Sequence, residues 1–194
     1  MASNSIGRRT VLAGALLAPL GATLARAAAD EAAPEQRTVL VAYMTRSGNT
    51  QVIAGTLHRT LGGALFQIRT ARAYPADYEA TVEQARRERD AGTEPPLVER
   101  FADIVQVQTI FLGFPIWGET APPPIRSFLR MHDLTGKTVR PFITHGGYGI
   151  GNAMEVLRSH APGAQVEEPF VMEADQERRT LNQVRGWLET MDDA

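Results

Sequence analysis

The chain has no cysteine among its 194 residues. Without thiols it cannot form a disulfide framework, a cysteine zinc site or an iron–sulfur cluster, and it has no thiol nucleophile. Its four histidines are not accompanied by an H-x-x-x-H pair or an acidic cluster. The sequence therefore predicts no metal site and no constellation of catalytic side chains.

The chain also has little excess charge of either sign. The net charge is −2 with a sequence pI near 6.1, and no basic tract occurs, so we expect no nucleic-acid partner. The composition, 43% hydrophobic and 22% charged, is ordinary for a globular protein. The length is that of one domain with a sizeable core.

Long hydrophobic runs are missing as well. Residues 11–25 are mostly apolar, but Gly14, Pro19 and Gly21 interrupt them, and they are too few and too mildly apolar for a membrane span. They follow the pair Arg8-Arg9. Small-x-small patterns that end at Ala27 and at Ala29 come after them. Residues 1–29 are therefore predicted to be an export signal cleaved after Ala27 or Ala29.

This segment resembles a twin-arginine signal, with Gly and Val where Ser or Thr and Phe are usual around the arginine pair. A general secretory signal with two arginines, or an uncleaved anchor, is the alternative. The resemblance implies a periplasmic protein with no stable membrane span after cleavage. Cleavage would remove three arginines and no acidic residue. The remaining chain would have 17 basic and 22 acidic residues, a net charge of −5. Residues 30–36 are predicted to be a flexible leader.

From residue 37 to residue 194 the pattern alternates between strands and helices. Apolar runs bounded by loops predict strands, and amphipathic or charged stretches predict helices. This alternation predicts an α/β domain with a parallel sheet and right-handed crossovers. The strands are predicted at 39–43, 64–69, 108–114, 138–144 and 165–172, and the helices at 50–61, 76–92, 125–131, 152–159 and 175–191.

The first predicted strand ends in a polar loop with hydroxyls and a glycine, and a helix follows. Backbone amides at a helix N-terminus and nearby hydroxyls form a site for an anion, so this loop is a candidate phosphate site. It lacks the ATP and dinucleotide fingerprints, which favours a small ligand with one phosphate. An ordinary strand–turn–helix connection is the alternative. The loop consists of Thr45, Arg46, Ser47, Gly48, Asn49 and Thr50.

Two more unusual loops follow the third and fourth strands. One combines prolines with a tryptophan, and the other is rich in glycine. With the first loop they meet at the carboxyl edge of the predicted sheet, where open α/β sheets bind ligands. A phosphate cradle, an aromatic face and a glycine-rich loop suit a phosphorylated, flat, aromatic ligand. The candidate residues are Pro115, Ile116, Trp117 and Gly118, and Thr144, His145, Gly146, Gly147, Tyr148 and Gly149.

These loops resemble those of flavodoxins. T-R-S-G-N-T is similar to their phosphate loop, and P-I-W-G-E-T-A-P-P-P and T-H-G-G-Y-G are similar to the two loops that contact the flavin ring, in a short bacterial branch. The resemblance extends from residue 37 to the C-terminus. It implies a flavodoxin-like three-layer sandwich, with a five-stranded parallel sheet of order 2-1-3-4-5, and FMN as cofactor. That branch usually has an aromatic residue where this chain has Gly118 and a glycine where it has Glu119.

The resemblance implies an FMN-binding electron-transfer protein that acts with a redox partner protein or a small-molecule donor or acceptor. An NAD(P)H- or quinone-dependent FMN oxidoreductase is one alternative, because Gly118 leaves room for a second substrate. A non-redox binding module on the same fold is another. The Y-P-A-D-Y stretch at 74–78 is also familiar from this branch, but we interpret it as a helix start. The oligomeric state cannot be inferred from the sequence.

Overall fold

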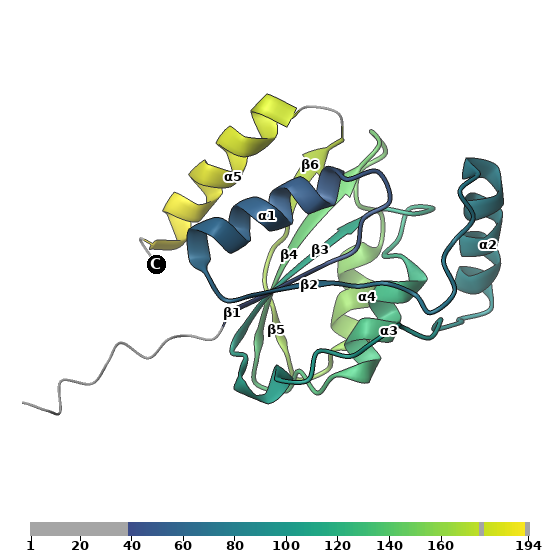
Figure 1. Ribbon diagram of the computed structural model, residues 1–194, viewed down its shortest axis with the longest axis horizontal. Coiled ribbons are helices and arrows are strands. Elements are labelled where there is room, and N and C mark those ends of the chain that lie inside the picture. The colour runs from purple at the N-terminus through teal and green to yellow at the C-terminus, as the bar shows by residue number, and fades with distance from the viewer. Residues whose placement is uncertain (1–38, 175–176, 193–194) are drawn as a thin grey trace, which may run out of the picture. The chain divides into compact units, whose positions relative to one another are not determined.

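The computed structural model describes residues 39–174 and 177–192. The predicted signal and leader, 1–36, lie outside these residues. Strands and helices alternate along the described chain (Figure 1). The elements are β1 (Val39–Tyr43), α1 (Asn49–Leu61), β2 (Ala64–Gln67), α2 (Tyr78–Asp90), the 3₁₀ turn η1 (Ile104–Gln106), β3 (Thr109–Pro115), α3 (Pro123–Met131), β4 (Thr138–His145), α4 (Ala153–His160), β5 (Gln165–Val166), β6 (Phe170–Glu173) and α5 (Glu177–Asp192).

The strands form one parallel sheet of order β2-β1-β3-β4-β5, which confirms the predicted topology. The sheet has six strands rather than five, because the last predicted strand is divided into β5 and β6, which both pair with β4. The division faces Pro141 of β4, which has no N–H to donate to the neighbouring strand. Pro169 lies in the same interval, and pairing resumes at Phe142 with Phe170.

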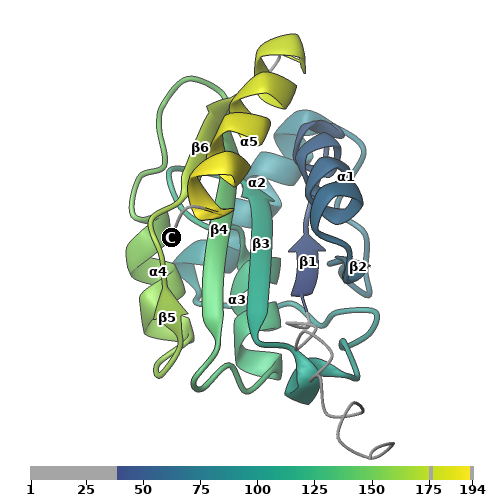
Figure 2. The same ribbon diagram turned by 90° about the vertical axis from the view of Figure 1, so that its left-hand side faces the viewer.

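The sheet is buried on both faces, and successive residues of each strand point to opposite sides. On one side Val41, Tyr43 and Phe111 pack with residues of α1 and α5. On the other side Leu40, Ala42 and many others pack with residues of α3 and α4. Figures 1 and 2 show the corresponding three layers. Trp187 of α5 is partly buried and stacks on Phe170 beside the residues that pack with α1 and α5.

Helix α2 differs from the other helices because it lies beyond the carboxyl edge, beside α3, and not flat on the sheet (Figure 1). Only Thr81 and Ala85 of its thirteen residues are buried. Asp77 caps its N-terminus by accepting a hydrogen bond from the Ala80 amide at 2.8 Å. This position puts α2 over the edge at which the three candidate loops end. In the described residues, no helix is both long enough and apolar enough to cross a membrane.

Candidate functional site

The three candidate loops meet at the carboxyl edge of the sheet. β1, β3 and β4 are neighbours, with Tyr43 paired to Gly113 and Pro115 paired to Thr144. The hydroxyls of Thr50 and Thr144 share a hydrogen bond of 2.9 Å, and both side chains are buried. The first and third loops are therefore joined directly across the switch point of the sheet.

The loop before α1 has the geometry of an anion site. Gly48 adopts φ 97°, a left-handed conformation that favours glycine, and its amide donates to Thr45 Oγ1 at 3.0 Å. Helix α1 begins at Asn49 without a side-chain cap and without an acidic residue in its first turn. The first-turn amides have no acceptor within the helix. They remain available to an anionic group, with the positive end of the helix dipole behind them.

The loop after β3 presents Trp117 in a tight turn. The Trp117 amide donates to the Thr120 carbonyl at 3.1 Å, and the two central residues, Gly118 and Glu119, have φ values of 58° and 63°. These values define a turn of type I′. Trp117 is half-buried, and its ring meets the ring of Tyr74 edge to face at 4.9 Å. One part of the indole is thereby fixed, and the rest faces a cavity.

The glycine-rich loop after β4 is organised by His145. Its Nδ1 accepts a hydrogen bond from the Gly147 amide at 3.0 Å. His145 therefore forms a hydrogen bond within the loop through this nitrogen. Tyr148 is 88% exposed, so its ring covers nothing in this structure. Thr144, at the end of β4, lies buried beneath the loop.

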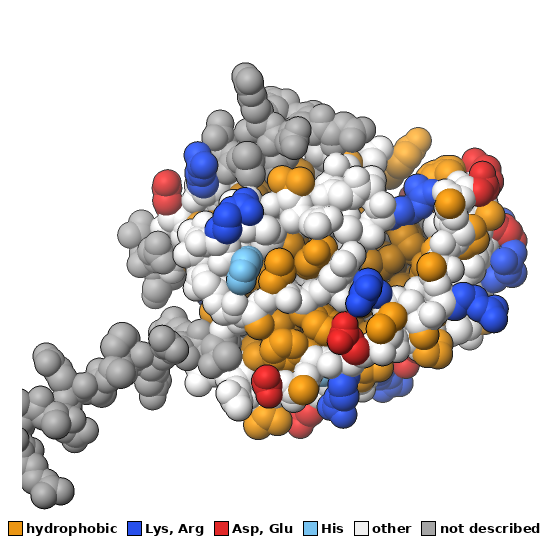
Figure 3. All heavy atoms as spheres, in the orientation of Figure 1, with side chains coloured by type: hydrophobic (Ala, Val, Ile, Leu, Met, Phe, Trp, Pro, Cys, Tyr) orange, Lys and Arg blue, Asp and Glu red, His pale blue; other side chains and the backbone are white. Residues whose placement is uncertain are grey.

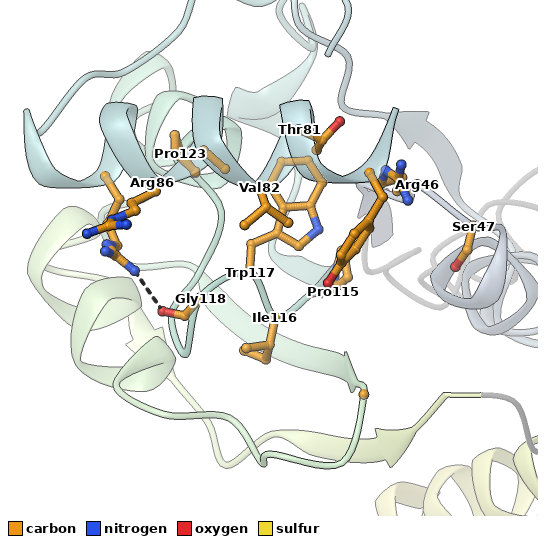
Figure 4. A pocket seen from close by; sticks show the side chains of 14 residues that line it. Arg46, Ser47, Thr81, Val82, Arg86, Pro115, Ile116, Trp117, Gly118 and Pro123 are labelled. Atoms are coloured by element: carbon orange, nitrogen blue, oxygen red, sulfur yellow. Dashed lines mark hydrogen bonds between the residues drawn. The ribbon is translucent and has the colours of Figure 1, made fainter. Parts of the chain in front are cut away.

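A cavity of about 360 Å³ joins the three loops (Figure 4). A cavity of this volume is typical of small-molecule binding sites. Hydrophobic side chains line the hollow beside α2, with basic side chains near it (Figure 3). The predicted residues that line it come from all three loops: Arg46, Ser47, Pro115, Ile116, Trp117, Gly118 and Gly146. Of the others, Thr45 lines an adjoining cavity, and Gly48, Asn49, Thr50, Thr144, His145, Gly147, Tyr148 and Gly149 lie outside the lining.

Helix α2 forms the opposite wall of this cavity, which the sequence analysis missed. The charge pattern of 76–92 predicts a solvent-exposed helix, and most of its residues are exposed. One side nevertheless faces Trp117 (Figure 4). The Y-P-A-D-Y stretch at 74–78 could have indicated this role, since its second tyrosine, Tyr78, is part of the wall. The α2 residues that line the cavity are Tyr78, Thr81, Val82, Ala85, Arg86 and Arg89.

Three hydrogen bonds and one cation–π contact hold α2 over the loops. Arg46 donates to the carbonyl of Ala76 at 3.1 Å and lies over the ring of Tyr78 at 5.4 Å. The hydroxyl of Tyr74 donates to the carboxylate of Glu88. At the far end, Arg89 Nη1 donates to the carbonyl of Gly118 at 3.2 Å, the dashed line in Figure 4. Gly118 makes this approach possible, because a Cβ there would lie 2.7 Å from the guanidinium.

The surroundings of Tyr74 keep its hydroxyl protonated. Burial raises the pKa of its phenol well above the ordinary value of 10, and the adjacent carboxylate of Glu88 raises it further. Tyr74 is therefore a neutral hydrogen-bond donor and not a proton acceptor. Glu119 does not line the cavity of the three loops. It lines a neighbouring polar pocket.

Comparison with known proteins connects this site to a family. The profile of the flavodoxin family matches residues 38–191. A flavoprotein from Bacteroides eggerthii is 31% identical, with a TM-score of 0.68, and the match covers 79% of this chain and 96% of that one. A flavoprotein from Bacteroides uniformis is 28% identical, with a TM-score of 0.67 and coverages of 76% and 97%.

A flavoprotein from Lactobacillus acidophilus, solved in complex with FMN, shares the fold with a TM-score of 0.62 at 20% identity, over 75% of this chain and 99% of that one. No curated protein matches the chain. The profile match spans most of the sequence, and the sheet order, the loop positions and the similar structures agree with it. The chain therefore belongs to the flavodoxin family.

Proposed function

We propose that this protein binds FMN at the three-loop cavity and transfers electrons through it. The observation that carries the proposal is the convergence of three parts at one cavity: the polar loop that leads into the uncapped helix α1, a half-buried tryptophan and a glycine-rich loop. Each part suits a different part of one ligand: a phosphate, a flat aromatic ring and the polar edge of that ring. The flavodoxin family and the FMN complex of the Lactobacillus protein support this choice of ligand.

In this proposal the first loop holds the phosphate. The hydroxyls of Thr45, Ser47 and Thr50 and the amides that begin α1 supply neutral donors, and the helix dipole adds positive potential. Two of the hydroxyls are already positioned, Thr45 by Gly48 and Thr50 by Thr144. Preorganised donors lose little conformational entropy when an anion binds.

The other two loops and α2 are proposed to enclose the ring. FMN, when bound, supplies the redox chemistry, and the protein supplies orientation and electrostatics. Trp117 and Ile116 offer apolar surface, and Val82 on α2 excludes water from the opposite side. His145 keeps the glycine-rich loop in place through its Nδ1, so the backbone of that loop is available to a ring edge.

One observation favours a reductase as the second candidate. A polar pocket of about 480 Å³ lies beside the cavity and shares Arg89 and Gly118 with it. Such a pocket gives room for a second substrate, as an NAD(P)H- or quinone-dependent oxidoreductase requires. Steady oxidation of NADPH by the purified protein alone would favour this candidate. Reduction only through a partner protein would favour the carrier, whose predicted net charge of −5 suits a basic partner.

The proposal is tested by titrating the purified apoprotein with FMN and with riboflavin, which lacks the phosphate. We expect saturable quenching of flavin fluorescence by FMN and binding weaker by at least about tenfold for riboflavin, because charge-assisted hydrogen bonds to the phosphate are lost. Equal affinities would contradict the phosphate role of residues 45–50. A colourless protein that binds neither flavin would favour a non-redox module.

A further inference from the structure

The polar pocket beside the flavin cavity has a floor and walls from four parts of the fold. Arg89 comes from α2, Arg126 from α3, and Glu119 and Thr120 from the turn after β3. Gly151 and Asn152 precede α4, and the Asn152 amide donates to the Glu119 carbonyl at 3.1 Å. The turn is thereby fastened to the start of α4, so the pocket has a fixed outline and is not a gap between loose segments.

Two guanidinium groups share this pocket without a matching pair of carboxylates. Arg89 is bonded to Asp90 at 2.8 Å. Arg126 forms no ion pair with any carboxylate in the described part of the chain, and its Nε is buried without a hydrogen-bond partner there. Glu94, whose charge acts on Arg126, is already paired with Arg130 at 3.2 Å.

The environment of Arg126 is unfavourable for its positive charge. Burial lowers the pKa of its guanidinium, and the charge of Arg89 lowers it further, while Glu94 opposes both. A partly buried cation without a partner is unfavourable, so an anion at this position would stabilise Arg126. The acid in the lining, Glu119, is exposed, so its charge is screened by water more than that of Arg126.

Thr120 also lines the pocket, but its hydroxyl lies in the protein interior without contact to solvent. Its side chain is only 3% exposed, and its Oγ1 has no hydrogen-bond partner among the described residues. Buried hydroxyls are normally hydrogen-bonded. Asn152, opposite, is an exposed amide at the N-terminal end of α4, where the helix dipole favours negative charge. The two arginines and the amide of Asn152 together form the donor set of an oxyanion site.

We propose that this pocket binds a carboxylate or phosphate group of a small-molecule substrate that lies beside the flavin. The inference rests on the proposed function, because the pocket shares Gly118 and Arg89 with the cavity assigned to the flavin. Arg126 is the principal charged contact, and Arg89 links the substrate group to α2. The site selects acidic substrates over neutral ones of similar size.

The test is a titration of the FMN-loaded, isotope-labelled protein with inorganic phosphate and, separately, with acetate, at constant ionic strength. We expect saturable shifts in the backbone amide resonances of 118–120 and 151–152. The loop 45–50 should not respond, because FMN occupies it. The probe that saturates at the lower concentration identifies the preferred group.

Variants make the assignment specific. Arg126→Gln should weaken the preferred probe about tenfold, because a charged hydrogen-bond donor is lost, and Arg126→Lys should retain part of the binding. Arg158→Gln is the matched control. Arg158, on α4, pairs with the exposed Glu168, and its substitution changes the net charge by the same amount. Shifts that do not saturate, or that Arg126→Gln and Arg158→Gln change equally, would overturn the proposal.

The two proposals fail in different ways. Flavin content is measured from visible absorption before each titration, independently of the amide shifts. A protein that binds no FMN but shows the Arg126-dependent shifts would contradict the flavin assignment and leave the oxyanion site standing. A flavin-loaded protein without those shifts would contradict the oxyanion site and leave the flavin assignment standing.

Discussion

Glu119 is the one non-glycine residue with a positive φ among those that the structure describes. Left-handed backbone costs a residue with a Cβ roughly 1 kcal/mol relative to glycine. We predict that Glu119→Gly stabilises the domain by about that amount in urea unfolding. Glu119→Gln is the control, because it removes the charge and keeps the strain. If Gln stabilised the domain as much as Gly, charge and not backbone strain would be the cause.

His132 makes stability depend on pH. It is buried, its Nδ1 lies 2.8 Å from the Phe128 carbonyl, and its Nε2 accepts from the Phe101 amide at 3.0 Å. Burial lowers the pKa of this imidazole below its ordinary 6.5. The hydrogen bond that Nδ1 donates to the Phe128 carbonyl opposes this shift, and the charge of Arg100 lowers the pKa further. The folded state therefore favours neutral His132, whereas the unfolded chain takes up the proton first on acidification.

We therefore predict that neutral His132 makes its full contribution to the free energy of unfolding above pH 6.5. This contribution should decline as the pH falls below that value. Denaturant unfolding at a series of pH values measures this. His132→Gln keeps an amide donor and acceptor but does not titrate, so its profile should lack the His132 part of the decline. Parallel profiles for the two proteins would show that other groups cause the acid sensitivity.

Single-residue roles could be predicted where residue type alone restricts the chemistry. Trp117 and the glycines at 146–149 were identified in this way. The strain at Glu119 could not be predicted, because its φ is imposed by the turn and by the hydrogen bond from Asn152. Nor could the burial of His132, since it depends on packing between α3 and the segment around Phe101. Both properties come from contacts distant in sequence.

At the scale of elements, the loop before α1 depends on Gly48. We predict that Gly48→Ala lowers FMN affinity about tenfold, because a Cβ at φ 97° disfavours by roughly 1–2 kcal/mol the conformation that holds the phosphate. Gly136→Ala is a matched control. It has φ 73° and space for a Cβ, but lies in the turn before β4, at the opposite edge of the sheet.

The FMN titration of the two variants separates backbone strain in general from strain at the site. Both should lose similar stability in denaturant unfolding. Only Gly48→Ala should lose affinity. Equal losses of affinity would mean that global destabilisation weakens binding, and the loop would then have no special role.

Helix α2 is attached through Tyr74 more than through its own packing. We predict that Tyr74→Phe keeps the edge-to-face contact with Trp117 but loses the hydrogen bond to Glu88, which weakens the docking of α2 by about 1 kcal/mol. Amide exchange of 78–90 should then be faster, with little change in β3 or β4. Tyr78→Phe, at a 61% exposed position, should leave exchange unchanged. Uniformly faster exchange would instead indicate global destabilisation.

At the scale of the whole molecule, the order of the sheet could be predicted because alternating strands and helices admit few topologies. Strand 39–43 was predicted with its observed bounds, since polar residues end it sharply. The position of α2 could not be predicted. Its charged residues predict a helix that faces water. The contact of its other side with the cavity depends on loops that are distant in sequence, so it is visible only in the structure. The family assignment rests on the profile match over residues 38–191.

Export is also a property of the whole chain. The twin-arginine resemblance leads us to propose that the protein is exported after folding, so that FMN is loaded before it leaves the cytoplasm. We predict that Arg8→Lys with Arg9→Lys retains an unprocessed precursor in the cytoplasm, whereas Arg26→Lys, near the cleavage site, is processed and exported. Fractionation with detection of both forms measures this. Normal export of the double variant would instead indicate the general secretory route, in which the chain crosses unfolded and would have to acquire FMN outside.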